Sequence, residues 1–314
     1  VEGTEGISQL YSLEIELLHD SQKQVKTPFV PELNSVLGQA AVISLTQRDG
    51  GARYFNGIFN FFKLTGRTDN YSFYNATLVP QVWELTQVIQ SRIFQQKNVP
   101  DILKEVFNGY QVKFELQWQY KPRNYCVQYA ETDFDFASRL MEEEGICYYF
   151  DFSNTAETLI ITDHFQQPRD CPEKNEFPIY DEQLNEDVGE ETAIRNWFVE
   201  YKVQPGKVTL WDYHFQMPKK KLDAQQISRH EIAGNRQLEI YKYPGGYARK
   251  YDGISKDGGE QASDLQNMFD DNQQSVKDQM EIWDSDFISY YGDSDCGTMI
   301  PGSRFSLKNH PQKE

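Results

Sequence analysis

The side chains in this sequence that are best suited to acid–base or metal chemistry are five histidines, His19, His164, His214, His230 and His310. None lies in a His-Glu-x-x-His or His-x-x-x-His spacing, which would place two imidazoles on one helical face to bind a metal ion. His164 follows Asp163 and His214 lies near Asp212, so each could form a local Asp–His pair. No Gly-x-Ser-x-Gly nucleophile elbow accompanies them. The pattern favours surface or loop histidines over a catalytic triad or a metal site.

Paired carboxylates are the second candidate, because glycosidases hydrolyse their substrates with two of them. The candidates are Asp133 with Asp135, the glutamates at 142–144, and Asp293 with Asp295. Asp133 and Asp135 begin a predicted helix, where capping and the helix dipole explain them. The glutamates end the same helix, whose other face is apolar, which favours a solvated face. A carbohydrate-active or carbohydrate-binding β-protein remains as the alternative function.

Phosphate-binding patterns are absent from the sequence, which has neither a GxxxxGK[ST] loop nor a GxGxxG turn after a strand. Asp and Glu number 48 against 31 Lys and Arg, so the formal net charge is −17. Such a chain repels phosphate backbones and anionic lipid unless it carries a strong basic patch. The densest basic cluster, the lysines at 219–221, is most simply a solvated loop. We therefore expect neither a nucleic-acid partner nor a cofactor.

The cysteines and the apolar segments bear on the compartment in which the chain folds. The cysteines are Cys126, Cys147, Cys171 and Cys296, and no pair has CxxC spacing. A reduced, cytosolic folding environment is the simplest interpretation, with one or two disulfides left open. No stretch approaches the roughly 18 apolar residues that span a bilayer. The sequence begins at Val1 rather than Met, and we expect the natural chain to extend beyond both ends.

The composition indicates which elements must position these side chains. At 314 residues the chain fits two domains or two lobes, and its 14% aromatic content favours β-structure. Tyr11, Leu13, Ile15 and Leu17 alternate with polar residues, which predicts a half-buried strand. Further strands are expected at residues 41–46, 53–64, 71–79, 112–118, 146–152, 158–162, 194–200, 207–211, 286–291 and 304–307.

Turn residues suggest how some of these strands connect. Asp49-Gly50-Gly51 predicts a hairpin between the strands at 41–46 and 53–64. Pro205-Gly206 is expected to be the turn between the strands at 194–200 and 207–211. The last two strands are expected to pair around Pro301-Gly302, and the polar stretch 166–191 is expected to be a connection.

Three helices are predicted from caps and apolar spacing. Asn98 caps the first, near residues 99–108, and Pro100 lies in its first turn. Thr132 caps the second, near 133–144, and Gly145 ends it. The third is an amphipathic helix at 259–283.

Two segments go beyond composition. Residues 91–102 (SRIFQQKNVPDI) and 125–146 (YCVQYAETDFDFASRLMEEEGI) resemble signature segments of the VgrG spike proteins of bacterial type VI secretion systems. They are also similar to the related phage tail hub proteins of the late-control D group. Collinear supporting motifs occur at 3–8, 54–58, 209–215, 243–247, 294–296, 301–305 and 310–311. The residues of this structural signature are Arg92, Phe94, Pro100, Thr132, Asp133, Phe134, Asp135, Phe136, Arg139, Leu140 and Gly145.

The resemblance implies a fold of class α+β, mainly β. In it, two similar β-barrel domains with short packed helices form a trimeric ring of pseudo-six-fold symmetry. The first barrel would be residues 1–85, completed by parts of 163–235. The second would be 86–162, completed by 285–314, with a connecting helical segment at 236–284. An OB-fold and a β-helix spike would follow downstream of this chain.

The resemblance also implies a structural hub rather than an enzyme. The partners would be two further copies of the chain, an Hcp-like tube protein, baseplate components, and effectors or their adaptors. Such a protein would be assembled in the bacterial cytoplasm and secreted to the exterior or into target cells. Asp133, Asp135 and Arg139 would cap and pair around the second helix, and its phenylalanines and Leu140 would fix it in place. Arg92 would either pair with a carboxylate or contact another subunit.

Overall fold

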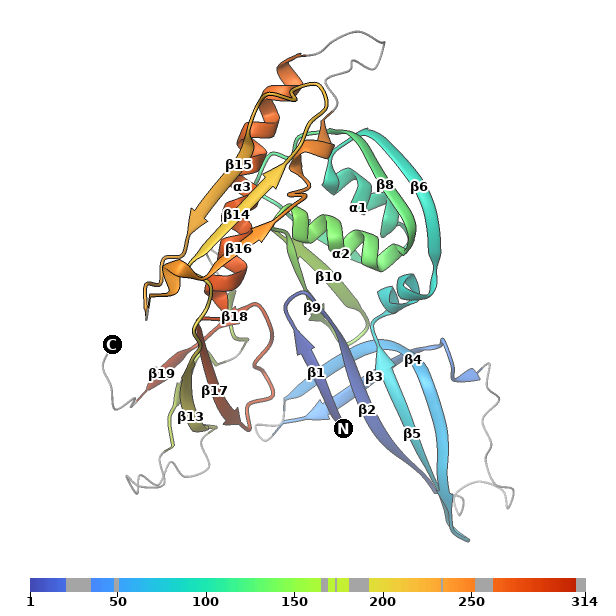
Figure 1. Cartoon of the computed structure of the whole chain (residues 1–314). Helices are drawn as coiled ribbons and strands as arrows, with labels where there is room; N and C mark the ends of the chain where they lie inside the picture. The colour runs from blue at the N-terminus through green and yellow to red at the C-terminus, as the bar shows by residue number, and fades with distance from the viewer. Residues whose placement is uncertain are drawn as a thin grey trace.

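The computed structural model describes residues 1–20, 35–47, 51–164, 169–172, 174–180, 192–232, 234–251 and 262–308. The described chain is mainly β with a few helices, and its sheets are mostly open (Figure 1). The predicted turn residues Asp49 and Gly50, most of 166–191, the first residues of the third helix, and His310 and Pro311 lie outside the described residues.

The N-terminal part is a five-stranded antiparallel sheet in the order β1-β2-β5-β4-β3. Its strands are β1 (Glu2–Gly6), β2 (Gln9–Asp20), β3 (Ala40–Thr46), β4 (Ala52–Arg67) and β5 (Tyr71–Val79). Tyr11, Leu13 and Ile15 of β2 are buried as their alternation predicts. β3 and β4 pair antiparallel, and the Gln47 N–H donates to the Gly51 oxygen at 2.9 Å, which confirms the hairpin pairing.

The middle part packs two helices between small sheets. β6 (Ile89–Lys97) pairs with β8 (Arg123–Thr132), and β7 (Val112–Glu115), β10 (Glu157–Thr162) and β9 (Cys147–Phe152) form a three-stranded sheet. Between them lie α1 (Val99–Val106) and α2 (Asp133–Glu143), and the 3-10 helix η2 (Gln81–Gln87) precedes β6. Residues from Tyr11 to Ile161 share one hydrophobic core, so the N-terminal sheet and the middle part are packed together.

Both predicted helix caps are present. The Asp101 N–H donates to Asn98 Oδ1 at 2.9 Å, and the Asp135 N–H donates to Thr132 Oγ1 at 2.9 Å. Gly145 ends the second helix with φ at 66°, the left-handed region where glycine avoids a Cβ clash. The predicted caps and stops therefore place α1 and α2 correctly.

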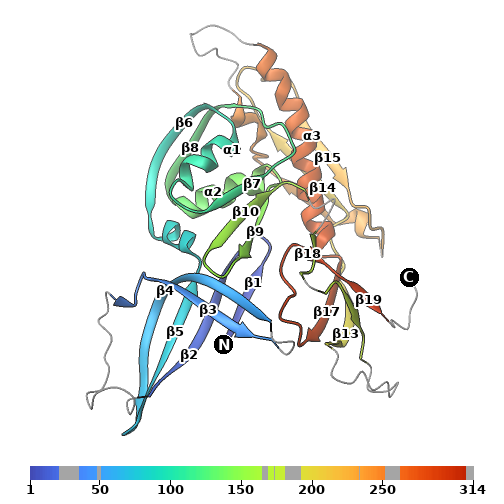
Figure 2. The ribbon, with the colours of Figure 1, turned by 180° about the vertical axis from the view of Figure 1, so that it is seen from behind.

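The C-terminal part has its own core. α3 (Ala262–Ser285) lies along the sheet of β15 (Leu222–Ile227), β14 (Lys207–Asp212) and β16 (Glu239–Lys242) (Figure 2). Val208, Leu210 and Leu222 of the sheet pack against Met268, Val276 and Met280 of the helix, together with Tyr247 of η4 (Tyr247–Lys250). The third predicted helix, the amphipathic one at 259–283, is therefore confirmed over the part of it that the structure describes.

Three further strand pairs complete the chain. β13 (Ile194–Tyr201) pairs antiparallel with β17 (Ile288–Ser294). β11 (Arg169–Asp170) and β12 (Glu176–Pro178) pair parallel with β18 (Ser303–Arg304) and β19 (Ser306–Lys308). These pairs lie together, away from the five-stranded sheet (Figure 2).

One predicted strand pair is wrong. Pro205-Gly206 lies between β13 and β14 as expected, although these two strands do not pair with each other: β13 pairs with β17, and β14 pairs with β15 and β16. The strands at 286–291 and 304–307 do not pair with each other, since β17 pairs with β13 and β19 with β12. Turn residues show where the chain reverses, but the strand partner is set by packing between distant segments. The described strands between residues 169 and 227 pair with one another or with later strands, at 239–242 and 288–308. None of them pairs with a strand of the five-stranded sheet.

Candidate functional site

The signature residues meet where β6 and β8 pass the start of α2. Asp133 is buried, and its Oδ1 accepts from Arg92 Nη2 and from Gln128 Nε2, each at 2.8 Å. Its Oδ2 accepts from Gln90 Nε2 at 2.9 Å, and Arg92 Nε donates to Gln128 Oε1 at 2.8 Å. Capping and dipole alone therefore do not explain Asp133, although Asp135 is exposed in the first turn as expected. Of the two roles left open for Arg92, the structure shows the pair with a carboxylate.

The apolar signature residues form the adjoining core. Phe94 and Phe136 stack with ring centroids 5.5 Å apart, and Phe134 meets Tyr148 edge to face at 5.9 Å. Leu140 is completely buried, and Pro100 lies in the first turn of α1. These are the contacts of a packed structural unit.

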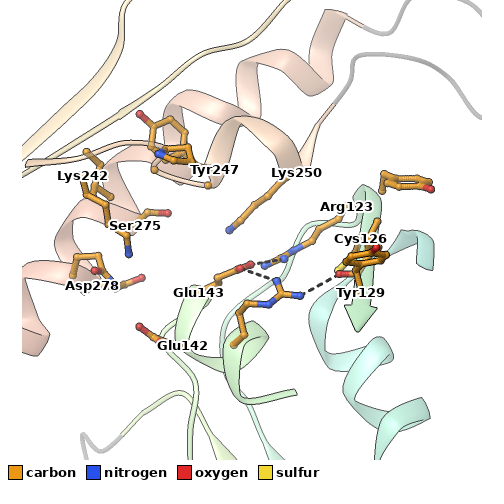
Figure 3. A pocket seen from close by; sticks show the side chains of 18 of the residues that line it. Arg123, Cys126, Tyr129, Glu142, Glu143, Lys242, Tyr247, Lys250, Ser275 and Asp278 are labelled. Atoms are coloured by element: carbon orange, nitrogen blue, oxygen red, sulfur yellow. Dashed lines mark hydrogen bonds and ion pairs between the residues drawn. The ribbon is translucent and has the colours of Figure 1, made fainter. Parts of the chain in front are cut away.

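A pocket of about 690 Å³ lies between this unit and the C-terminal part (Figure 3). Lys242, Tyr247 and Lys250 lie on one side, and Arg123, Glu143 and Tyr129 lie on the other. Arg139 lines it as well, and its guanidinium pairs with Glu131 at 2.6 Å and with Glu143 at 3.1 Å. The pocket therefore marks the boundary between the two hydrophobic cores.

An ionic junction, defined here as Arg123, Glu143, Glu144, Lys250 and Asp271, joins the two cores beside this pocket. The Arg123 side chain is 5% exposed and that of Lys250 is 8% exposed. Arg123 Nη1 donates to Glu143 Oε2 at 2.7 Å, and its Nη2 donates to Glu144 Oε1. The same Glu144 oxygen accepts from Lys250 Nζ at 2.9 Å, and Lys250 lies 3.8 Å from Asp271 of α3.

The predicted solvated face at 142–144 holds for Glu142 and Glu143, which are both exposed, and is wrong for Glu144, which is half-buried. Glu143 nevertheless pairs with the buried Arg123, and Glu144 pairs with both Arg123 and Lys250. Sequence spacing could not reveal this, because Lys250 lies more than a hundred residues away from Glu144. The available signal was weak: Arg123 is the only cation in the segment that forms β8, at its first residue.

The electrostatics of the junction bear on chemistry. Burial alone would favour the neutral acid, but Lys250 and Arg123 outweigh burial and lower the pKa of Glu144. Arg123 and Arg139 likewise overcome burial and lower the pKa of Glu143. Burial opposes the charge of Arg123, yet Glu144 and Glu143 raise its pKa. Both glutamates are thus held ionised, so neither can act as the protonated acid of a glycosidase pair.

The other carboxylates that the sequence offered as candidates for chemistry are also bound by neighbouring side chains or backbone groups. Asp293 accepts from Asn196 Nδ2 at 2.7 Å, and Asp295 lies 3.5 Å from Arg195. Asp163 accepts from the Gln117 and Trp118 N–H groups and from the Tyr120 hydroxyl, and lies 3.1 Å from its neighbour His164.

His214 does not pair with Asp212. The histidine is buried with Nε2 2.8 Å from the Tyr251 oxygen, whereas Asp212 accepts from the Gly246 and Ala248 N–H groups. His214 lies in the loop that follows β14, as the interpretation of a surface or loop residue allows, but it is buried there. All four cysteines are free thiols. The described residues contain no group of three His, Cys, Asp or Glu side chains able to hold a metal ion.

Large apolar side chains are exposed on two of the strand pairs. On β6 and β8 these are Ile89, Ile93, Tyr125, Val127 and Tyr129; on β13 and β17 they are Phe198, Val199, Tyr201, Tyr290 and Tyr291. Phe198 and Tyr291 stack at 5.0 Å across the β13–β17 pair. Phe198 and Tyr291 lie on one face of this pair, and Val199 and Tyr290 on the other, because successive side chains of a strand alternate between faces. Exposed apolar side chains that gather on one surface mark interaction sites in soluble proteins.

Comparison with known proteins agrees with a structural role. A family model described as the phage tail baseplate hub (GPD) matches residues 4–314. The type VI secretion spike protein VgrG1b of Pseudomonas aeruginosa is 35% identical over 257 residues, which cover 81% of this chain and 33% of that protein. VgrG5 of the same organism is 28% identical over 99% of this chain and 36% of its own length. The chain therefore spans about a third of the length of these relatives.

Solved structures show the same fold. An E. coli component of the type VI secretion system, c3393, superposes with a TM-score of 0.52 and 24% identity, over 64% of this chain and 51% of that one. It is described as structurally similar to the bacteriophage T4 tail proteins gp27 and gp5. A tail protein from Neisseria meningitidis gives a TM-score of 0.51 at 10% identity, over 82% of this chain and 77% of that one.

The matches are to a phage tail baseplate hub family and to spike proteins of type VI secretion systems, which are structural parts of those assemblies. Within the described part of the chain, no helix has both the length and the apolar character needed to cross a bilayer. The continuous family match, the shared fold and the packed signature unit lead to one conclusion: this chain belongs to the phage tail baseplate hub family and is similar to the spike proteins of type VI secretion systems.

Proposed function

We propose that this chain is the hub region of a type VI secretion spike. In this role it trimerises, caps the secretion tube and carries the puncturing spike for effector delivery. The observation that carries the proposal is the 35% identity to VgrG1b over 81% of the chain, within a family match that reaches from residue 4 to residue 314.

The architecture that we propose is a ring of three subunits, each contributing two similar β-barrels. The open sheets and the exposed apolar side chains of β13 and β17 support it, because a two-stranded pair is marginally stable until something covers it. Obligate subunit interfaces are apolar in the same way. The boundaries 1–85 and 86–162 remain predictions for the cores of the two barrels.

The partners that follow are an Hcp-like tube protein, baseplate components, and effectors or their adaptors. An OB-fold and a β-helix spike would follow downstream. The protein would be assembled in the bacterial cytoplasm and secreted by the type VI machine to the exterior or into target cells. We assign the signature residues a structural role: the Arg92–Asp133 pair and the Phe94–Phe136 stack lock α2 against β6 and β8.

The mass of the full-length protein tests this proposal. Size exclusion with light scattering should give three times the subunit mass. Phe198→Asp combined with Tyr291→Asp should lower that mass, because two desolvated charges would oppose contact at the β13–β17 face. Trp118→Asp, which changes an exposed aromatic residue outside that face, is the matched control and should leave the trimer intact. A full-length protein that stays monomeric at tens of micromolar would overturn the proposal.

A further inference from the structure

The N-terminal sheet meets the β9–β10 pair at one buried tyrosine. Tyr11 of β2 is 1% exposed, and its ring packs edge to face on Phe150 at 4.9 Å and on Phe152 at 5.2 Å. Its hydroxyl oxygen is in hydrogen-bond contact with the backbone oxygen of Asn56 on β4 and with Glu157 Oε2 on β10. Three strands from two sheets therefore converge on this phenolic oxygen.

The number of available protons limits how these contacts can be made. A tyrosine hydroxyl carries one proton, and both a backbone carbonyl and an ionised carboxylate only accept. With an ionised Glu157, Tyr11 could satisfy one of its two neighbours but not both. A protonated carboxyl supplies the missing donor, since it can donate to the phenolic oxygen while Tyr11 donates to Asn56. The other carboxyl oxygen, Oε1, accepts from the Gln81 N–H at 2.5 Å, which leaves Oε2 as the position for the proton.

We propose that Glu157 is a proton-dependent joint between the two sheets: its protonated carboxyl donates to Tyr11, Tyr11 donates to Asn56, and loss of the proton loosens the contact.

The surroundings of Glu157 support a neutral carboxyl. Burial raises the pKa of Glu157 to about 7. The ionised form could accept from Tyr11 and from the Gln81 N–H, and these hydrogen bonds only partly oppose the effect of burial. Glu5 of β1 is the other carboxylate that acts on Tyr11, and it pairs with Arg53 of β4. On β9, Asp151 lies opposite Thr158, the residue after Glu157, and pairs with Arg169. No cation is among the causes acting on Glu157, so the chain does not compensate a charge there.

The expected pH dependence follows from linkage. The folded-state pKa of about 7 lies above the value of 4.5 expected in the unfolded chain, so the folded state binds more protons between these values. The contribution of this group to stability is complete below about pH 4.5 and is lost as the pH rises through 7. Glu157→Gln keeps a neutral N–H donor of similar shape and removes the titration.

The test compares urea unfolding of the full chain with that of Glu157→Gln between pH 5 and pH 8. From pH 5 to pH 8 the unfolding constant of the unaltered chain should rise by on the order of a hundredfold relative to the variant. Glu142→Gln removes an exposed carboxylate and should keep the pH profile of the unaltered chain. Identical profiles for the unaltered chain and Glu157→Gln would overturn the proposal.

A second measurement does not require the glutamine variant to fold. Infrared difference spectra of the unaltered chain across pH 5–8 should show a protonated carboxyl band that disappears near pH 7. Tyr11→Phe removes the acceptor and should shift that band. The absence of any protonated carboxyl band at pH 6 would overturn the proposal.

Discussion

Arg123 Nη1 lies 2.7 Å from Glu143 Oε2, and this pair connects the first residue of β8 to the last residue of α2. The Arg123 side chain is almost fully buried, although the sequence around it gives no sign of a partner. Through Glu144 the same guanidinium is linked to Lys250, in the part of the chain that has its own hydrophobic core. Contact between the two cores is therefore partly ionic.

Replacing Arg123 by Met should destabilise the chain by about 3–5 kcal/mol, because Glu143 and Glu144 lose a cation inside a partly desolvated junction. Urea unfolding at pH 7 measures this difference. Arg169→Met is the matched control, since the Arg169–Asp151 pair at 3.1 Å is largely exposed and should contribute below about 1 kcal/mol. Equal costs for the two variants would contradict a structural role for the junction.

Acid should weaken the same junction. Arg123 and Lys250 lower the folded-state pKa of Glu144, so its stabilising contribution is present above about pH 4.5 and is lost as the pH falls below it. Between pH 5 and pH 3 the unaltered chain should therefore lose more stability than Arg123→Met. Parallel pH profiles over this range would show that the pairs do not couple to folding. This pH dependence is opposite in sign to that expected for Glu157.

Asp133→Leu should cost about 3–5 kcal/mol, because it leaves Arg92, Gln128 and Gln90 without a shared acceptor at a buried site. Thermal or urea unfolding monitored by circular dichroism provides the measurement. Asp135→Leu removes an exposed carboxylate from the same helical turn and should cost well under half as much. Both variants remove a negative charge from the first turn of α2 and so weaken the interaction with the helix dipole, but only Asp133→Leu also removes the acceptor of the buried network. The difference between their costs therefore measures the contribution of the network.

Thr132→Ala should cost about 1 kcal/mol, because the Asp135 N–H loses its side-chain acceptor at the start of α2. Thr132→Ser keeps the hydroxyl and should restore most of the loss. If serine and alanine behave alike, the hydrogen bond would not be the cause of the change, and loss of the threonine methyl would explain it instead.

The elements that follow local rules could be predicted from the sequence. Asn98, Thr132 and Gly145 fix the ends of α1 and α2, and alternation along Tyr11, Leu13 and Ile15 fixes the buried face of β2. The strand partners could not be predicted in the same way. β13 pairs with a strand almost a hundred residues later, and a period of two along one strand does not identify its partner.

The candidate site shows the same division between local and distant contacts. The resemblance identified Arg92 and Asp133 because each lies in one of the two signature segments, 91–102 and 125–146. These two segments pack against each other through β6 and β8. The ionic junction was missed, since Glu143 and Glu144 follow the ordinary pattern of a solvated helix end. The contacts of Glu144 depend on Lys250 of η4, which comes from a distant part of the sequence and also lies near Asp271 of α3.

The late strand partners also bear on how the chain can be synthesised. Arg169 is paired with Ser303, and Glu176 with Ser306, so each early strand must leave the ribosome well before its partner exists. The core that ends at Ile161 can form during translation, whereas these edges stay open until residues 303–308 emerge. Premature termination just before Ser303 would leave them permanently unpaired, and unpaired strand edges recruit other chains into aggregates.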